Sequence, residues 1–416
     1  MNVTIHASTA KGAIKAQPSK SMAHRSIICA LLSDGVCRID NIALSEDILA
    51  TIDCAGALGA KVEVLPESLI ITGISGRCAH TEADFPCRES GSTMRFFMGI
   101  AMALGIRARF YGSETLLGRP FGIYEEICRK QQIRFERKAD HILVDGRLQP
   151  ACFEIPGNIS SQFVSGFLFG LPLLTADSCI RLKPPVESRS YIDLTLQALS
   201  AFDVKADPDG NDLMIPGKQT YRHMDLTVEG DYSNAAFLDA FNLLGGKVSI
   251  SGLDDDSRQG DRVYRKHFES LQKGCTTIDL SDCPDLGPIL FTMAALLHGG
   301  DFIGTKRLQM KESDRGRVMC EELAKCGVKT VMEENRIRIL PSEVKKPDEP
   351  LLSHNDHRIA MSLAVLLTKT GGTIREAQAV SKSYPDFFTD LGRLGIGLKM
   401  ETNSEVLKGL HDGMDQ

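Results

Sequence analysis

Six polar clusters along the chain have the residue types of an anion-binding site. Each contains serine, aspartate or glycine and is followed by an apolar run typical of a buried helix. Hydroxyl and carboxylate side chains are common at a helix start, where backbone N–H groups lack partners, whereas the helix dipole disfavours cations there. Basic residues at such positions therefore predict an anionic ligand that meets both them and the backbone N–H groups. The clusters carry the basic residues Lys20, Arg25, Arg95 and Arg358.

Further cations lie in short polar segments between the clusters. They are Arg119 in GSETLLGRP, Lys311 and Arg315 in MKESDR, and Lys382 in SKSYPD. The whole chain is nevertheless acidic, with 48 basic and 54 acidic residues and a net charge of −6. We therefore expect no broad surface for nucleic acid or anionic membranes. The recurring cations instead predict a basic cleft between two lobes that binds small, multiply charged anions, such as phosphorylated ones.

Carboxylates beside these cations could complete a reaction centre. Glu312 and Asp314 lie between Lys311 and Arg315, and Asp285 opens the fifth cluster. In a desolvated cleft such a pairing can tune a proton donor or acceptor. On a surface the same pair is a salt bridge that contributes less than about 1 kcal/mol. The spacing is compatible with both interpretations.

Two other patterns have weaker chemical implications. His354 and His357 have the spacing of metal ligands, but no third ligand is near them in the sequence. Ser160 and Ser161 have no neighbouring base that would activate a nucleophile. We interpret these serines as hydroxyl donors to a ligand or as plain helix caps.

The clusters recur at a nearly fixed interval, which is the signature of a repeated structural unit. The steps between their reference residues are 70, 70, 70, 54 and 71, counted over Ser21, Gly91, Ser161, Asp231, Asp285 and Asp356. Between them the sequence predicts a strand, a more amphipathic helix and a hairpin. Each unit is therefore roughly βαβαββ, and six units account for the chain.

Helices that are apolar on every face must be buried, and six are too many for one small core. We therefore expect an α/β protein of two lobes with three units each. The N-terminal lobe spans residues 19–230, and the C-terminal lobe combines 1–18 with 231–416. The alternative, an ordinary doubly wound sheet, predicts a glycine-rich phosphate loop after an early strand, and no such motif occurs.

The twelve cysteines indicate small core residues rather than metal ligands. No two of them form a C-x-x-C pair, and the N-terminal sequence lacks the apolar core of a signal peptide. The apolar runs are shorter than the roughly 20 residues that span a bilayer. The sequence therefore predicts a reduced, cytoplasmic protein.

Taken together, the motifs resemble those of the EPSP synthase family, the 3-phosphoshikimate 1-carboxyvinyltransferases. The resemblance runs in order from about residue 17 to 390 and rests on SKSMAHR, SGSTMR, GRP, SSQF, SRSYID, EGDYSNA, KESDR, NDHRIAM and SKSYPDFF. It implies the enolpyruvyl transferase fold, an inverse α/β barrel of two lobes with three βαβαββ units each. It also implies transfer of the enolpyruvyl group of phosphoenolpyruvate to shikimate 3-phosphate, with release of phosphate.

The resemblance implies roles for individual residues. Shikimate 3-phosphate would be bound by Lys20, Ser21, Arg25, Ser160, Ser161, Gln162, Ser188, Tyr191, Asp285 and Lys311. Phosphoenolpyruvate would be bound by Lys20, Gly91, Arg119, Gln162, Arg315, Arg358 and Lys382.

The resemblance also implies the chemical roles. Asp285 would take the proton from the 5-hydroxyl of shikimate 3-phosphate, and Glu312 or Lys20 would protonate the methylene carbon of phosphoenolpyruvate. No metal or organic cofactor is called for, and we expect a monomer without nucleic-acid or membrane partners.

Some positions depart from the family pattern. Glu89 stands where asparagine is frequent, Gln309 replaces an arginine, and Arg307 lies where a smaller polar residue can contact shikimate 3-phosphate. Sensitivity to glyphosate and the function of the tail 401–416 do not follow from the sequence.

Two rival functions remain open at this point. A UDP-N-acetylglucosamine 1-carboxyvinyltransferase shares the fold and the donor, but commonly carries a reactive cysteine on the loop that here reads GSETLLGRP. A non-catalytic phosphate-binding module would bind anions without any need for Asp285 or Glu312.

Overall fold

The computed structural model describes residues 1–401, which form two compact units. Within residues 1–401, unit 1 contains Met1–Gln17, Gly230–Leu253 and 261–401, and unit 2 contains Pro18–Glu229 and Asp254–Gly260. The segment 254–260 therefore belongs to the unit of the N-terminal half, whereas the sequence pattern placed it with the C-terminal half. Ser19 Oγ donates to Gln259 Oε1 at 3.3 Å, a long-range contact that a repeat pattern cannot reveal. The tail after Glu401 lies outside the described residues.

Five four-stranded sheets within residues 1–401 share one pairing pattern, a parallel pair followed by two antiparallel strands. Unit 2 holds three of them. In pairing order they are β14 (Leu226–Thr227), β3 (Val36–Asp40), β5 (Ser68–Thr72) and β4 (Lys61–Val64); β6 (Glu82–Pro86), β7 (Arg107–Tyr111), β9 (His141–Asp145) and β8 (Arg134–Arg137); and β10 (Cys152–Pro156), β11 (Ser178–Lys183), β13 (Asp212–Ile215) and β12 (Asp207–Asp209).

Unit 1 holds two complete sheets and one reduced sheet. The complete sheets are β16 (Thr277–Asp279), β17 (Gly300–Ile303), β19 (Arg336–Ile339) and β18 (Thr330–Glu333); and β20 (Leu351–Leu352), β21 (Gly372–Arg375), β1 (Asn2–Ile5) and β22 (Leu398–Glu401). The reduced sheet pairs β15 (Lys247–Ser251) only with β2 (Lys11–Lys15). The fourth unit therefore departs from the βαβαββ pattern of the other five, because it lacks the hairpin. This missing hairpin explains the short step of 54 residues.

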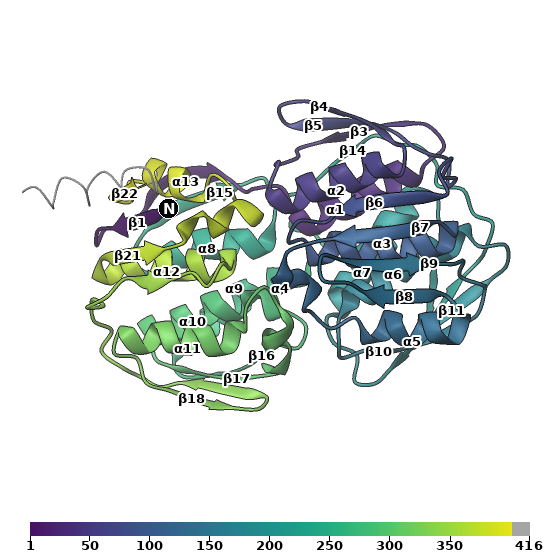
Figure 1. Cartoon of the computed structure of the whole chain (residues 1–416). Coiled ribbons are helices and arrows are strands. Elements are labelled where there is room, and N and C mark those ends of the chain that lie inside the picture. Colours follow the sequence, from purple (N-terminus) through teal and green to yellow (C-terminus); the bar gives the residue numbers. More distant parts are fainter. Residues whose placement is uncertain (402–416) are drawn as a thin grey trace, which may run out of the picture. The chain divides into compact units, whose positions relative to one another are not determined.

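Each repeat contributes one deeply buried helix and one amphipathic helix (Figure 1). In unit 2 the buried helices are α1 (Lys20–Leu32), α3 (Gly91–Leu104) and α6 (Ser161–Gly170), and the amphipathic ones are α2 (Glu46–Ala57), α5 (Gly122–Gln131) and α7 (Arg189–Ala201); a short α4 (Glu114–Leu117) precedes α5. In unit 1 the buried helices are α8 (Tyr232–Leu243), α10 (Gly287–Leu296) and α12 (His357–Thr370), and the others are α9 (Tyr264–Lys273), α11 (Arg315–Lys325) and α13 (Phe387–Arg393). Across residues 1–401 no helix has the length and apolarity needed to cross a membrane.

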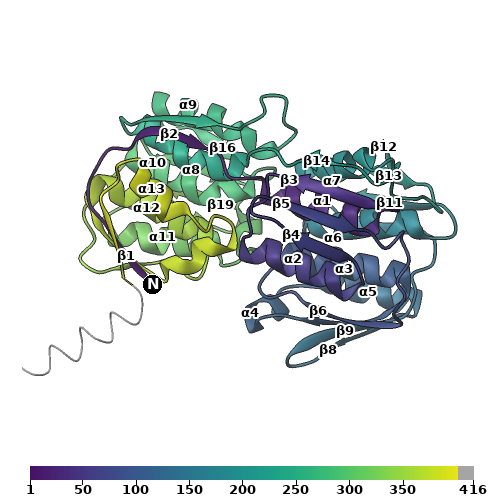
Figure 2. The same cartoon turned by 90° about the horizontal axis from the view of Figure 1, so that it is seen from above.

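Glycines allow the buried helices α3 and α6 to approach each other closely (Figure 2). A Cβ atom added at Gly99 of α3 would collide with the carbonyl of Gly166 in α6. A Cβ atom at Gly170 would lie 2.6 Å from the carbonyl oxygen of Gly99. Since real Cβ atoms do not approach backbone this closely, only glycine fits. The close contact brings the start of α6, with Gln162, beside the start of α3, with Gly91.

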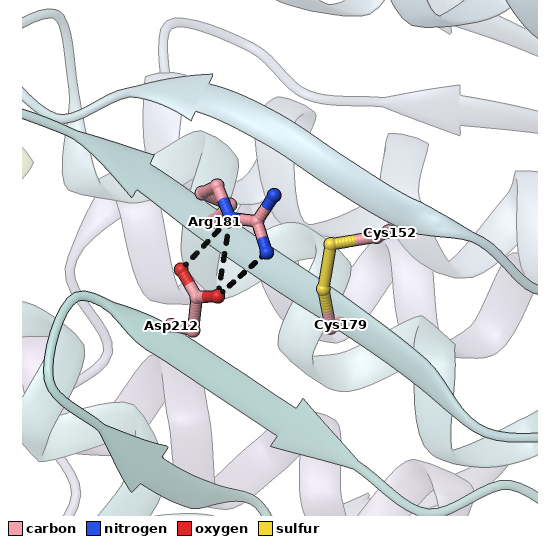
Figure 3. The surroundings of a disulfide bond; sticks show 4 residues. All are labelled: Cys152, Cys179, Arg181 and Asp212. Carbon is pink, nitrogen blue, oxygen red and sulfur yellow. Dashed lines mark hydrogen bonds and ion pairs between the residues drawn. A yellow bond between two sulfur atoms is a disulfide. The ribbon is translucent and has the colours of Figure 1, made fainter.

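Two of the twelve cysteines are paired, so the expectation that all are reduced was wrong (Figure 3). Cys152 and Cys179 form a disulfide between the parallel strands β10 and β11, where they lie directly opposite each other in register. The other ten are free thiols, and most of them are buried as predicted. Sequence spacing could not show the pair, because the two positions meet only through the strand register.

Candidate active site

The serines predicted to cap the buried helices of unit 2 do so. Ser19 Oγ accepts from the backbone N–H of Met22, Ser90 Oγ from that of Thr93, and Ser160 Oγ from that of Gln162, at 3.3 to 3.4 Å. Each cap satisfies one of the free donors of the first turn. The remaining donors of these turns lie next to the predicted cations.

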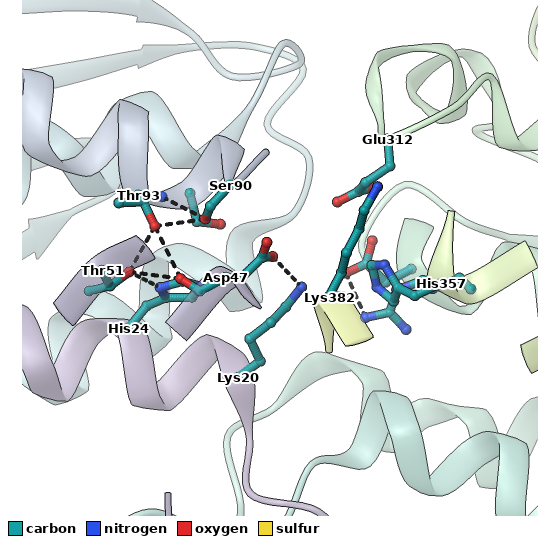
Figure 4. Close-up of polar contacts among 12 residues, drawn as sticks. Lys20, His24, Asp47, Thr51, Ser90, Thr93, Glu312, His357 and Lys382 are labelled. Atoms are coloured by element: carbon teal, nitrogen blue, oxygen red, sulfur yellow. Dashed lines mark hydrogen bonds and ion pairs between the residues drawn. The ribbon is translucent and has the colours of Figure 1, made fainter. Parts of the chain in front are cut away.

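Lys20, the first residue of α1, pairs with a carboxylate that the sequence analysis missed (Figure 4). Its Nζ lies 2.8 Å from Asp47 Oδ2, and both side chains are largely buried. Asp47 belongs to the first turn of α2, where an acidic residue suits the helix dipole. That local role concealed its contact with a lysine 27 positions away, so no sequence signal identified it.

Gly91, Arg119 and Gln162 come together at the start of α3. A Cβ atom added at Gly91 would lie 2.6 Å from Arg119 Nη1 and 3.7 Å from Gln162 Oε1. The Arg119 guanidinium therefore lies directly against the Gly91 backbone. Gln162 is held by two further contacts, since its Oε1 accepts from Arg95 Nη1 at 2.5 Å and its Nε2 donates to Ser92 Oγ at 2.9 Å.

Arg95 was predicted to bind an anion. In the structure its guanidinium instead donates to Gln162. Its guanidinium is buried and lies 5.3 Å from the ring centre of Phe121 and 5.0 Å from that of Phe163. Such stacking favours a fixed orientation of a planar cation. We infer that Arg95 positions Gln162.

Arg25 is likewise turned toward the protein. Its Nη1 donates to the carbonyl of Ser21, its Nε to Thr195 Oγ1 and its Nη2 to the carbonyl of Tyr191, at 2.6 to 2.8 Å. Burial lowers the pKa of Arg25 to about 10, which leaves it cationic at neutral pH. These bonds tie α1 to α7, whose N-cap Ser188 is buried and left-handed with φ 53°. The serines expected to bind shikimate 3-phosphate, which include Ser160 and Ser161, also belong to unit 2.

In unit 1 three cations surround Asp285. Its Oδ1 lies 2.8 Å from Arg315 Nη1 and 3.1 Å from Lys311 Nζ, and its Oδ2 lies 3.1 Å from Arg358 Nη2. Burial disfavours the charged form of Asp285, but the charges of Arg358, Lys311 and Arg315 outweigh it and hold its pKa well below the usual range. Asp285 is therefore a carboxylate at neutral pH. It does not cap α10, because it lies in the 3-10 helix Pro284–Leu286 that precedes this helix.

Arg315 is enclosed by carboxylates and is only 1% exposed. Besides Asp285, its guanidinium contacts Glu312 Oε2 at 2.5 Å and Asp356 Oδ2 at 2.8 Å. Burial opposes its charge, yet the three carboxylates raise the pKa of Arg315. In this structure Arg315 orders Asp285 and Glu312.

The start of α12 gathers further predicted residues. Asp356 caps this helix, since its Oδ1 accepts from the backbone N–H of Arg358 at 2.9 Å. Lys382 Nζ donates to the carbonyl of Asn355 at 2.5 Å. Arg358 and Lys382 therefore lie at the same helix start, as anion-binding residues would. His354, half of the possible metal pair, is bound to Glu322 Oε1 at 2.8 Å.

Comparison with known proteins decides the family. Residues 6–391 match the family model described as EPSP synthase (3-phosphoshikimate 1-carboxyvinyltransferase). The chain belongs to the EPSP synthase family. Curated relatives named 3-phosphoshikimate 1-carboxyvinyltransferase include that of Clostridium kluyveri, 37% identical over 94% of this chain and 97% of the relative. That of Clostridium perfringens is 40% identical over 96% of this chain and 99% of the relative.

Solved structures confirm the enolpyruvyl transferase fold of the EPSP synthase family. EPSP synthase from Acinetobacter baumannii has a TM-score of 0.77 at 21% identity and covers 96% of this chain and 100% of its own. The enolpyruvyl transferase NikO from Streptomyces tendae has a TM-score of 0.76 at 14% identity, with 96% and 98% covered. The family resemblance and the fold predicted from the sequence are thus confirmed. Neither the UDP-sugar transferase nor a non-catalytic module is favoured.

The protonation state of the buried His24 of α1 predicts how the stability of the protein depends on pH. Burial, and the nearby charges of Lys20 and Arg25, hold the pKa of His24 well below 6.5, so that it is neutral when folded. The unfolded chain takes up a proton near pH 6.5 that the folded chain does not, so acidification removes stability, by up to about 1.4 kcal/mol per pH unit. Urea unfolding should show this loss from pH 7 to 5.5, and His24→Asn should reduce it. Equal pH slopes for the two proteins would contradict the neutral histidine.

Proposed function

We propose that this chain transfers the enolpyruvyl group of phosphoenolpyruvate to the 5-hydroxyl of shikimate 3-phosphate and releases inorganic phosphate, a step of aromatic amino acid biosynthesis. The observation that carries the proposal is family membership over residues 6–391. The cations gathered at helix starts support it, because both substrates are phosphorylated carboxylates.

Unit 2 supplies most of the proposed contacts to shikimate 3-phosphate. The hydroxyl groups near the starts of α1, α6 and α7 are suited to its phosphate and ring, together with Lys20 and Gln162. Arg25 is proposed to act through the bonds that fix Ser21 and Tyr191, with its remaining N–H groups available to the phosphate. The residues proposed for this substrate in unit 2 are Lys20, Ser21, Arg25, Ser160, Ser161, Gln162, Ser188 and Tyr191; unit 1 adds Asp285 and Lys311.

The residues proposed for phosphoenolpyruvate are mostly cations, as the carboxylate and phosphate of this substrate require. Lys20, Gly91, Arg119 and Gln162 belong to unit 2, and Arg315, Arg358 and Lys382 belong to unit 1. Charge-assisted hydrogen bonds from arginine suit a carboxylate or a phosphate.

The proposed reaction is an addition followed by an elimination. The 5-oxygen of shikimate 3-phosphate bonds to C2 of phosphoenolpyruvate, its proton passes to Asp285, and C3 gains a proton from Glu312 or Lys20. C3 then loses a proton, the bond from C2 to the phosphate oxygen breaks, and phosphate leaves. In a site from which water is excluded, the cations stabilise the charge on the departing phosphate by about 3 kcal/mol.

The low pKa of Asp285 makes it a weak base while Arg315, Lys311 and Arg358 are paired with it. Phosphoenolpyruvate at Arg358 and shikimate 3-phosphate at Lys311 would draw these charges away from the carboxylate. The pKa of Asp285 would then rise toward that of a competent base. Substrate binding would in this way activate the base.

Phosphate release tests the proposed function. With phosphoenolpyruvate and shikimate 3-phosphate together we expect continuous turnover, and with either substrate alone none. UDP-N-acetylglucosamine in place of shikimate 3-phosphate should give no phosphate. Turnover with the UDP-sugar only would overturn the acceptor, and a lack of turnover with either would overturn the enzymatic function.

Gly91→Ala tests the proposed phosphoenolpyruvate contacts on unit 2. The added methyl would lie 2.6 Å from Arg119 Nη1, so the guanidinium must shift. We expect the KM for phosphoenolpyruvate to rise about tenfold, since a 1 Å displacement of a positioning group can cost about 100-fold. The KM for shikimate 3-phosphate should change little. An unchanged KM for phosphoenolpyruvate would contradict the assignment of Gly91 and Arg119.

A cytoplasmic monomer completes the proposal. Ten of the twelve cysteines are free thiols, as is usual in a reducing compartment, and the Cys152–Cys179 disulfide is an exception to that pattern. Light scattering on the purified chain would measure the mass, and a dimer would refute the monomer.

A further inference from the structure

Four buried polar side chains form a continuous hydrogen-bond chain across three helices of unit 2 (Figure 4). His24 Nδ1 of α1 lies 2.7 Å from Thr51 Oγ1 of α2, and Thr51 Oγ1 lies 2.7 Å from Thr93 Oγ1 of α3. Thr93 Oγ1 donates to Ser90 Oγ, the N-cap of α3, at 2.7 Å. All four side chains are at most 1% exposed. None of them was assigned a function above.

The chain has one direction. Each hydroxyl has a single proton, and that of Thr93 goes to Ser90 at 2.7 Å, because its other possible acceptor, the carbonyl of Asp47, is 3.5 Å away. Thr93 must then accept from Thr51, and Thr51 must accept from the imidazole. His24 is therefore a donor through Nδ1–H.

The surroundings of His24 favour the same tautomer. Within residues 1–401 its Nε2 is buried without a hydrogen-bond partner. Buried N–H groups without an acceptor are rarer than unused acceptors, so the proton belongs on Nδ1. With the proton on Nε2 instead, Thr51 would donate to the ring and Thr93 to Thr51. Ser90 would then lose the bond from Thr93.

The chain reaches the starts of α1, α2 and α3, which carry Lys20, its partner Asp47 and Gly91. Lys20 lies one turn before His24 on α1. Asp47, the partner of Lys20, lies one turn before Thr51 on α2. Its carbonyl oxygen lies 3.3 Å from Thr51 Oγ1 and 3.5 Å from Thr93 Oγ1, longer than the 2.7 Å bonds that the chain makes with the same two protons. Ser90 directly precedes Gly91.

We propose that His24 is a positioning residue that, as the donor of a one-way chain through Thr51 and Thr93 to Ser90, holds the first turns of α1, α2 and α3 in the register that presents Lys20 and Gly91 to phosphoenolpyruvate. This inference rests on the proposed function, specifically on the assignment of Lys20 and Gly91 to that substrate. His24 itself touches no substrate in this scheme.

Variants of matched shape separate positioning from packing. His24→Leu removes the donor, whereas His24→Asn has a similar shape and can place an amide N–H where Nδ1–H was. Thr51→Val and Thr93→Val each replace a hydroxyl by a methyl group. Initial rates would give kcat and the KM of each substrate, and thermal unfolding would show that each variant is folded.

We expect kcat/KM for phosphoenolpyruvate to fall about tenfold in His24→Leu, Thr51→Val and Thr93→Val, by loss of preorganisation. The KM for shikimate 3-phosphate should stay within about twofold, and His24→Asn should recover most of the loss. Because the chain acts as a unit, His24→Leu combined with Thr93→Val should be no worse than either alone.

Three results would overturn the proposal: wild-type kcat/KM in the folded Leu or Val variants, no advantage of Asn over Leu, or equal losses for both substrates. If His24→Leu does not fold, Thr51→Val and Thr93→Val test the proposal. Wild-type kcat/KM, or equal losses for both substrates, would then overturn it. Lys20→Met tests the underlying assignment separately. If it loses activity while the His24 and threonine variants do not, only the present inference fails.

Discussion

Replacing Asp285 by asparagine should lower kcat by about three orders of magnitude, within the range that general acid–base catalysis contributes. Asparagine keeps the shape but cannot accept the proton of the 5-hydroxyl. The KM for phosphoenolpyruvate should not rise, because the variant removes a carboxylate that competes with this substrate for Arg315 and Arg358. Steady-state rates of phosphate release would give both constants.

A surface aspartate of the same unit provides the matched control. Asp301 of β17 accepts from Arg336 at 2.6 and 2.8 Å but lies outside the proposed site. Asp301→Asn should leave kcat within about twofold of wild type, as for most surface changes. A kcat of wild-type size in Asp285→Asn, with the protein folded, would remove Asp285 from the role of base.

The pH dependence gives the same assignment a second test. The profile of kcat/KM reports the free enzyme, in which the pKa of Asp285 is held well below its usual range, so its acid limb should lie below about pH 4. The profile of kcat reports the enzyme with substrates bound, where the cations are engaged. Its acid limb should therefore lie at higher pH and should be absent from the residual activity of Asp285→Asn.

The sequence identified candidate anion-binding cations because basic residues at helix starts contradict ordinary capping preferences. Lys20 and Arg358 stood out in this way, and the structure places both at such starts. It could not show which way each side chain points. Arg95 and Arg315 were indistinguishable from them by type and spacing, yet Arg95 is stacked between aromatic rings and Arg315 is enclosed by carboxylates.

Partners that come from another helix or strand were also beyond the sequence. Asp47 fits a helix start by itself, and only the packing of α2 against α1 brings it to Lys20. Cys152 and Cys179 meet through the register of two parallel strands. The period of 70 residues, in contrast, predicted the repeated unit, since a fixed interval needs only local patterns to be recognised. Its one exception, the step of 54, marked the unit without a hairpin.

Lys20→Met should lower kcat/KM for phosphoenolpyruvate by about 10² to 10³, the range observed when one preorganised donor to a developing charge is removed. Methionine keeps the length and the apolar stem of lysine and loses only the ammonium group. Lys130→Met is a control, because Lys130 forms an exposed pair with Glu126 on α5 and should cost less than twofold.

Because Lys20 pairs with Asp47, the Lys20→Met test needs a second variant. Lys20→Met leaves Asp47 largely buried without its cation, which would destabilise the protein and repel anionic substrates. Asp47→Asn added to Lys20→Met removes that charge. If the ammonium itself binds substrate, the double variant should regain stability in urea unfolding while kcat/KM stays low. Recovery of kcat/KM in the double variant would mean that Lys20 serves only to neutralise Asp47.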